Sequence, residues 1–163
     1  MYIARDQRWG RGVEGGGEDV LLGNLFAAAR VRGFQGASLK SNEHFLATAK
    51  HFAAYGAAEA GLDYNTVDMS ERTLREVYLP PYKAALDAGA LSVMASFNEI
   101  SGIPATGNRW LMRDVLRGEW KFDGFVVSDY TGDEEMIAHG YAKDGRDAAR
   151  IALLASRLCE GRP

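Results

Sequence analysis

The chain has 163 residues, of which 47% are hydrophobic, and this length suffices for one ordinary globular domain with a sizeable core. Lys and Arg number 19 against 22 Asp and Glu, and the resulting net charge of −3 argues against a nucleic-acid-binding surface, which needs clustered basic charge. No stretch approaches the ~18 consecutive apolar residues of a transmembrane helix, and the single cysteine, Cys159, excludes an internal disulfide and a cysteine-based zinc site.

The predicted elements begin with a short strand over residues 2–4, which runs into a charged turn. A helix is predicted over residues 19–32, with Gly33 in the place of a helix-ending glycine. Its apolar side chains share one face, as in an amphipathic helix. They are Leu21, Leu22, Leu25, Phe26 and Ala29.

The middle of the chain holds two further predicted strands, over residues 45–52 and 91–97. Between them Ser70 is a good N-cap for a helix, because its hydroxyl can accept from a backbone amide of the first turn. Pro80 and Pro81 should kink that helix, because neither has a backbone N–H to donate.

The last third of the chain continues the alternation of helices and strands. Asn108 can cap a helix that Gly118 stops, a fourth strand covers residues 124–128, and Asp144 opens an alanine-rich helix. Such alternation indicates right-handed βαβ units and a parallel sheet. A complete eight-stranded barrel takes about 250 residues. Four strands therefore make about half a barrel, so the chain is either an open sheet or a piece of something larger.

Polar residues follow the ends of three predicted strands: Lys50 and His51, Asn98 and Glu99, and Ser128 and Asp129. In barrels and open α/β sheets the site lies at this edge. The pattern alone leaves two interpretations open, a functional site or ordinary loop beginnings. As a site, Lys50 and His51 suit hydrogen bonding to a polyhydroxylated ligand, with Arg11 as a further donor.

Two other motifs carry less weight. The segment 10–15 matches the G-x-G-x-x-G pattern of dinucleotide sites, but the region about 20 residues on has no carboxylate. His44, His51 and His139 lack the spacing of a metal site, and a structural role is the better interpretation for His44 and His139.

Seven segments resemble, in order, the N-terminal domain of glycoside hydrolase family 3, the β-glucosidase group. They are ARDQRWGR at 4–11, GED at 17–19, KHFAAYG at 50–56, REVYLPPYK at 75–83, PAT at 104–106, VLR at 115–117 and GFVVSDY at 124–130. The match runs nearly unbroken from residue 3 to about 155.

The resemblance implies part of a (β/α)8 TIM-type barrel, about four βα units with helices outside, and a retaining exo-β-glucosidase that uses no cofactor or metal. Asp129 falls on the catalytic nucleophile, which forms a covalent glycosyl-enzyme. The family's pattern also implies residues that bind or line the sugar site. They are Arg11, Lys50, His51, Met94, Phe97 and Tyr130.

The chain departs from the family pattern at individual positions. Leu62 stands where many members carry a basic sugar-contacting residue, and Phe97 stands where many have Tyr. The branch that cleaves N-acetylglucosamine has a different continuation after Lys-His-Phe. The last difference favours a glucosidase or a xylosidase over a hexosaminidase, and a β-xylosidase is the alternative to the β-glucosidase.

The resemblance also implies a domain division: a partial barrel domain over residues 1–155 and a non-family tail over 156–163. The family's acid/base, usually a glutamate in a second domain, is not expected within this chain. A second hypothesis is therefore a truncated, non-catalytic product.

The expected partner is a small-molecule or oligosaccharide β-glycoside, with no nucleic acid and no membrane. Self-association through exposed sheet edges is a further expectation. The sequence leaves the compartment open, and the resemblance implies a periplasmic or secreted parent protein.

Overall fold

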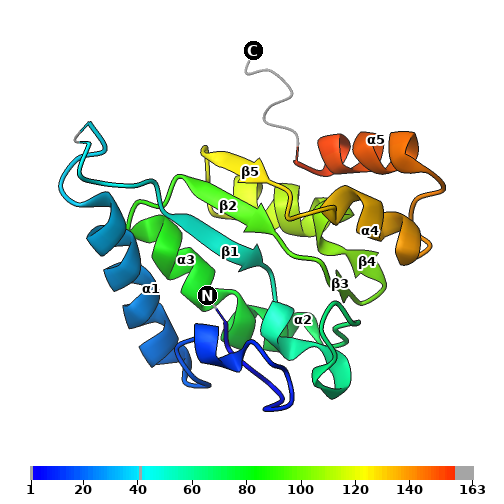
Figure 1. Ribbon diagram of the computed structural model, residues 1–163, viewed down its shortest axis with the longest axis horizontal. Helices are drawn as coiled ribbons and strands as arrows, with labels where there is room; N and C mark the ends of the chain where they lie inside the picture. The colour runs from blue at the N-terminus through cyan, green and yellow to red at the C-terminus, as the bar shows by residue number, and fades with distance from the viewer. Residues whose placement is uncertain (1, 41, 157–163) are drawn as a thin grey trace.

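The computed structural model describes residues 2–40 and 42–156, and a parallel sheet of three short strands lies at its centre (Figure 1). The strands lie in the order β1 (Thr48–Phe52), β2 (Ser92–Ala95) and β5 (Phe125–Val127). Because all three run in the same direction, their carboxyl ends meet at one edge of the sheet.

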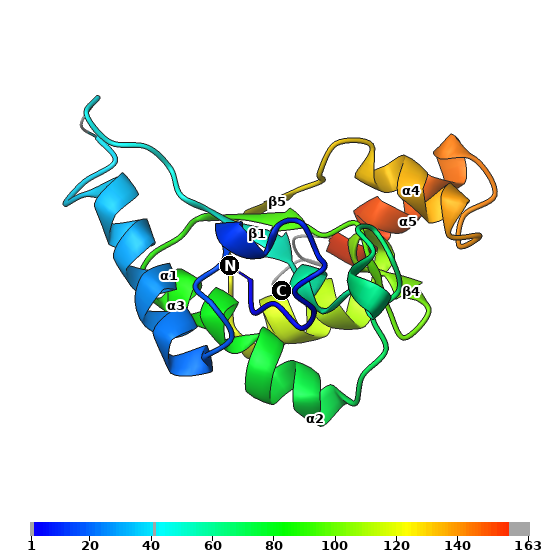
Figure 2. The same ribbon diagram turned by 60° about the horizontal axis from the view of Figure 1, so that its bottom comes forward.

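Helices cover one face of this sheet, as the second view shows (Figure 2). Helix α3 (Pro80–Asp87) contacts β1, and α1 (Val20–Gln35) packs beside α3. The π-helical segment η6 (Trp110–Glu119) supplies further buried side chains to the same core. Ala49 and Val93 are strand residues of this core, so alternate strand positions face the helices.

The opposite face of the sheet is largely open. Lys50 on β1 is exposed, and Phe125 and Val127 on β5 keep 49% and 37% of their surface accessible. A parallel sheet is ordinarily covered on both faces. One face of this sheet is therefore available for a site or for a packing partner.

Other elements lie outside the parallel sheet. Helices α4 (Gly132–Ala138) and α5 (Gly145–Ser156) pack on each other, and β3 (Glu99–Ile100) pairs with β4 (Ile103–Pro104) as an antiparallel hairpin. The remaining elements are short: η1 (Gly12–Glu14), η2 (Tyr55–Ala57), η3 (Glu59–Gly61), α2 (Glu71–Thr73), the π-helical η4 (Leu74–Tyr78) and η5 (Ala105–Gly107). The sequence pattern did not predict α4 or the hairpin.

The predicted parallel sheet is confirmed, with three strands in place of four. The strands lie within the predicted ranges 45–52, 91–97 and 124–128 but are shorter. The strand over residues 2–4 was wrong. Tyr2 is buried because its ring packs on aromatic side chains, and the segment has no ladder partner in the part of the chain described.

Three helices are capped at their N-termini by the side chains that the sequence predicted as caps. The Ser70 hydroxyl accepts from the Thr73 amide at 3.2 Å, and Asn108 Oδ1 accepts from the Leu111 amide at 3.0 Å. Asp144 caps α5 through the Asp147 amide at 2.8 Å. The predicted kink at the double proline is confirmed, since a bend at Leu79 separates η4 from α3, which begins at Pro80. The helix end predicted at Gly118 is one residue too early, because η6 ends at Glu119.

Helix α1 corrects two predictions. It continues past Gly33 to Gln35 and ends at Gly36, whose φ of 53° lies in the left-handed region. The expected apolar face is exposed, with Leu21 and Leu25 at 68% and 60% accessibility. The helix instead buries its small residues, Gly23, Ala27 and Val31. A Cβ at position 23 would lie 3.1 Å from Cδ1 of Ile3 and 3.4 Å from Cγ of Pro81, so the close packing of α1 against these two side chains favours glycine there.

No helix within the described residues is long and apolar enough to cross a bilayer. The predicted tail, with Cys159, lies outside the described residues from position 157 onward.

Candidate active site

The carboxyl edge of the sheet brings together His51 from β1 and Asp129, two residues after β5. His51 Nε2 lies 2.7 Å from Asp129 Oδ2, and both side chains are largely buried, with 2% and 15% of their surface exposed. Oδ1 of the same carboxylate accepts from the backbone amide of Tyr130 at 2.7 Å. The expectation that polar residues at the strand ends meet is confirmed for this pair.

The His51 ring is enclosed by aromatic side chains. Its Nδ1 is hydrogen-bonded to the hydroxyl of Tyr2, whose ring lies nearly parallel to the imidazole with centroids 5.7 Å apart. Tyr55 meets the imidazole edge-on at 5.3 Å, and Phe97 lies at 6.3 Å. Nδ1 is thus hydrogen-bonded within the chain, whereas Oδ2 of Asp129, which faces Nε2, is a buried atom without a hydrogen-bond partner among the described residues.

Burial lowers the pKa of His51 from 6.5 to about 4, although the nearby Asp129 carboxylate acts in the opposite direction. The positive charges of Arg11 and Lys50 lower this pKa further. The imidazole is therefore neutral at neutral pH, with one nitrogen as a donor and the other as an acceptor.

This buried neutral histidine should make the stability of the fold depend on pH. Between pH 6.5 and about 4 the unfolded chain holds a proton on His51 that the folded chain does not. The free energy of unfolding therefore falls as the pH falls through this window. Urea denaturation at a series of pH values measures the slope. In His51→Gln the slope between pH 6.5 and 5 should flatten, and an unchanged slope would contradict the assignment.

Arg11 lies beside the same aromatic side chains. Its guanidinium pairs bidentately with Glu14, with N–O distances of 2.8 and 2.9 Å. It also lies over the rings of Tyr55 and Tyr2, at 5.2 and 5.7 Å from their centroids. The hydrogen bonds from Arg11 lower the pKa of Glu14. This pairing fixes a cation next to the His51 site.

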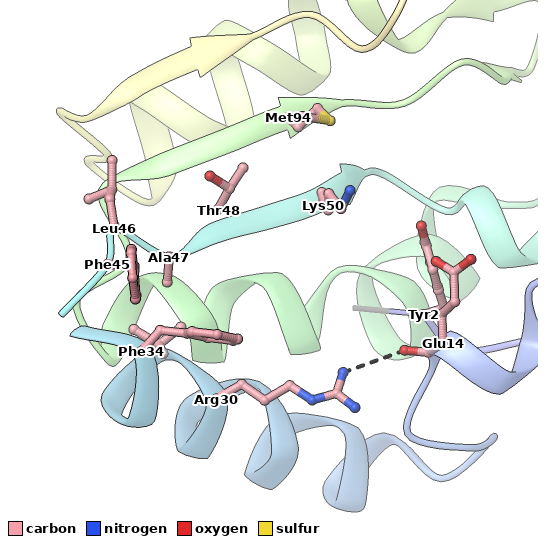
Figure 3. A pocket seen from close by; sticks show the side chains of 11 residues that line it. Tyr2, Glu14, Arg30, Phe34, Phe45, Leu46, Ala47, Thr48, Lys50 and Met94 are labelled. Carbon is pink, nitrogen blue, oxygen red and sulfur yellow. Dashed lines mark hydrogen bonds between the residues drawn. The ribbon is translucent and has the colours of Figure 1, made fainter. Parts of the chain in front are cut away.

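Lys50 and Met94 border a neighbouring cavity of about 480 Å³ on the open face of the sheet (Figure 3). Tyr2 and Glu14 line the same cavity, which extends toward α1 and Arg30. Asp129 is not among the lining residues.

The other predicted site residues lie apart from this cavity. Phe97 is buried with Tyr2, Trp9 and Tyr55 in one aromatic cluster, and its ring lies 4.3 Å from that of Tyr64. Tyr130 is 82% exposed. The structure thus brings Arg11, His51, Phe97 and Asp129 together, whereas the Tyr130 side chain extends into solvent.

The sequence did not predict three residues that build this site. Glu14 could have been found, because acidic residues three positions after an arginine often pair with it. Tyr2 and Tyr55 carry no such signal, since only the fold brings them onto His51. Among the described residues, no three His, Cys, Asp or Glu side chains gather as a metal site requires.

Comparison with known proteins gives consistent results. The model of the glycosyl hydrolase family 3 N-terminal domain matches residues 1–156. The chain is 50% identical over 153 residues to a periplasmic beta-glucosidase of Salmonella typhimurium, with 94% of the chain and 20% of the relative covered. It is 42% identical over 156 residues to a beta-xylosidase of Formosa agariphila, covering 93% of the chain and 22% of that protein.

Solved structures show the same likeness. The crystal structure of a beta-glucosidase from Listeria innocua in complex with glucose superposes with a TM-score of 0.92 at 52% identity, covering 94% of the chain and 22% of that protein. A β-glucosidase from Erythrobacter marinus gives 0.90 at 38% identity, covering 94% and 21%. The likeness confirms the predicted α/β fold, part of a TIM-type barrel. The chain spans about a fifth of the length of these relatives.

Proposed function

Because the chain belongs to glycosyl hydrolase family 3, we propose that it supplies the nucleophile and part of the sugar site of a retaining exo-β-glucosidase. One observation carries the proposal. Asp129 is a largely buried carboxylate at the carboxyl edge of a parallel sheet, and a neutral imidazole lies 2.7 Å away. Burying a carboxylate is costly unless it is hydrogen-bonded or has a function.

In the proposed reaction a carboxylate oxygen of Asp129 attacks the anomeric carbon of the terminal sugar. The bond from that carbon to the leaving-group oxygen breaks, and a covalent glycosyl-enzyme forms. Water then hydrolyses the ester and returns the carboxylate. The leaving group takes its proton from a second carboxyl group, which in retaining enzymes lies about 5–5.5 Å from the first.

The sugar-binding roles follow from the surroundings of Asp129. Arg11 and Lys50 are cations that can donate to sugar hydroxyls, and Arg11 is already oriented by Glu14. Met94 borders the open-face cavity, whereas Phe97 forms part of the aromatic wall behind His51. The exposed Tyr130 ring is available to pack on the sugar. His51 is assigned here to the sugar site as well, either by direct contact or through Asp129.

Trapping with an activated 2-fluoro-β-glucoside tests the proposal. An activated leaving group departs without a proton, so the first step needs Asp129 and the sugar site but no acid. We expect one covalent label per chain, located on Asp129 by peptide mass spectrometry, and none in Asp129→Ala. A label on another carboxylate would contradict the assignment.

A β-xylosidase function is the second candidate, and the 42% identity to a beta-xylosidase supports it. The matching 2-fluoro-xyloside distinguishes the two. Faster labelling by the glucoside supports the glucosidase, and faster labelling by the xyloside supports the alternative.

Two expectations about the whole protein remain proposals. A periplasmic or secreted location is supported by the name of the Salmonella relative. Self-association is supported by the open sheet face and the exposed leucines of α1. Sedimentation velocity showing only monomers at every concentration would contradict it.

A further inference from the structure

Three aromatic rings form a row that leads outward from the site. The imidazole of His51 faces the ring of Phe97 with centroids 6.3 Å apart, and Phe97 in turn lies 4.3 Å from the ring of Tyr64. The exposed fraction rises along this row, from 2% for His51 and 4% for Phe97 to 40% for Tyr64. Tyr64 therefore forms the outer end of a row whose inner end is the histidine beside Asp129.

The backbone holds Tyr64 in an unusual conformation. Its φ of 66° lies in the left-handed region, which is uncommon for a bulky side chain. Such a conformation persists where the surroundings fix it, and it occurs preferentially at ligand sites. On one side of Tyr64, Trp9 Nε1 donates to Oδ1 of Asp63 at 2.8 Å. On the other side, Asn65 Nδ2 donates to the carbonyl of Glu59 at 3.1 Å. Both neighbours of Tyr64 are thus anchored.

Tyr64 also lies within the electrostatic reach of Asp129. Burial raises the pKa of the Tyr64 hydroxyl, and the carboxylates of Asp63 and Asp129 raise it further. Such an effect requires proximity, because salt screens exposed charges over about 10 Å. Tyr64 therefore belongs to the surroundings of Asp129, and its exposed side faces the solvent outside the site.

We propose that Tyr64 is a specificity-determining residue, whose ring contacts the leaving group of the β-glycoside while the terminal sugar is held at Asp129. The inference rests on the proposed function, because that function places the anomeric carbon at Asp129. The leaving group is attached to this carbon and extends outward along the row, and His51 at the inner end remains available to the terminal sugar. An exposed aromatic face offers apolar surface to a flat group, such as an aryl ring or the C–H face of a second sugar. Flat leaving groups should therefore be favoured over small ones.

Two labelling reagents that differ only in the leaving group test this contact. They are a dinitrophenyl 2-fluoro-β-glucoside and 2-fluoro-β-glucosyl fluoride. With either reagent a carboxylate oxygen of Asp129 bonds to the anomeric carbon, and the leaving group departs with the bonding electrons as dinitrophenolate or fluoride. Neither departure needs a proton. Because the sugar and the covalent product are the same, the ratio of the two labelling rates reports on the leaving group alone.

Tyr64→Ala should slow labelling by the dinitrophenyl reagent about threefold to tenfold and change labelling by the fluoride less than about twofold. Tyr64→Phe keeps the ring and should keep both rates. Tyr141→Ala is the matched control, because Tyr141 is also 40% exposed but its ring lies against Gly107, and both rates should stay. An equal fall with both reagents in Tyr64→Ala, or an unchanged ratio, would overturn the proposal.

NMR of the tyrosine rings separates this proposal from the proposed function. The signals of Tyr64 are those missing in Tyr64→Phe. Adding phenyl β-glucoside should shift them and leave those of Tyr141 in place. If Asp129 is labelled but the Tyr64 signals do not move, the proposal fails and the proposed function stands. If the Tyr64 signals move but neither reagent labels Asp129, the proposed function fails and the contact of Tyr64 with the glycoside stands.

Discussion

Asp129→Ala is expected to lower β-glucoside hydrolysis by about four orders of magnitude or more, because the covalent step loses its nucleophile. The effect is best measured in a chimera in which residues 2–156 replace the matching segment of the Salmonella relative. The 50% identity over 153 residues makes that exchange practical. Initial rates on an aryl β-glucoside, for the chimera with and without the substitution, give the ratio.

Asp123→Ala is the matched control for this experiment. Asp123 is exposed and precedes β5, so it lies at the opposite end of that strand from Asp129. Its rate should stay within about twofold, as for most surface substitutions. Added azide should restore glycosyl transfer in Asp129→Ala, because a small anion can occupy the space and attack the anomeric carbon. A rate within tenfold of the parent chimera without azide would show that Asp129 is not the nucleophile.

Phe52→Ala is expected to destabilise the chain by about 3–5 kcal/mol. Phe52 is fully buried at the end of β1, and its ring meets those of Tyr82 and Trp120 edge-on at 5.2 and 5.8 Å. Removing the ring leaves a cavity between the sheet and its helices, in addition to the lost burial of apolar surface. Such a loss is a large fraction of the stability of an ordinary domain. Urea denaturation followed by tryptophan fluorescence measures it.

Phe45→Ala makes the same chemical change three residues before β1. Phe45 is 70% exposed, so its removal should change the free energy of unfolding by under about 0.5 kcal/mol. Equal losses for the two variants would mean that Phe52 does not form part of a packed core.

The sequence predicted the sheet better than the way the helices pack. Each of the three strands lies in a run of mostly apolar residues, as is typical of buried parallel strands. Their parallel direction follows from the helices that connect them in the sequence. Helix α1 was predicted correctly apart from its last turn, but its buried face was not. Periodicity places Leu21 and Leu25 on one face, while Gly23 and Ala27 carry no hydrophobic signal. Only the folded structure, in which Ile3 and Pro81 lie against Gly23, shows why a small residue is buried there.

The candidate site was also predicted only in part. The meeting of His51 and Asp129 was predictable, because parallel strands end at one edge. The position of Tyr2 on the imidazole was not, since a segment outside the sheet brings it there. The sequence also could not show that the Tyr2 hydroxyl is hydrogen-bonded to Nδ1 of His51. That hydrogen bond joins residues 49 positions apart in the sequence.

The sheet with one covered face has a thermodynamic consequence. Phe125, Val127 and the leucines of α1 are already in contact with water in the folded chain. Unfolding therefore hydrates less new apolar surface than in a domain with both sheet faces covered, and apolar hydration is the main source of the heat-capacity increase. A smaller heat-capacity increase gives a flatter curve of stability against temperature, so this chain should lose less of its stability on cooling than a fully enclosed fold of equal length.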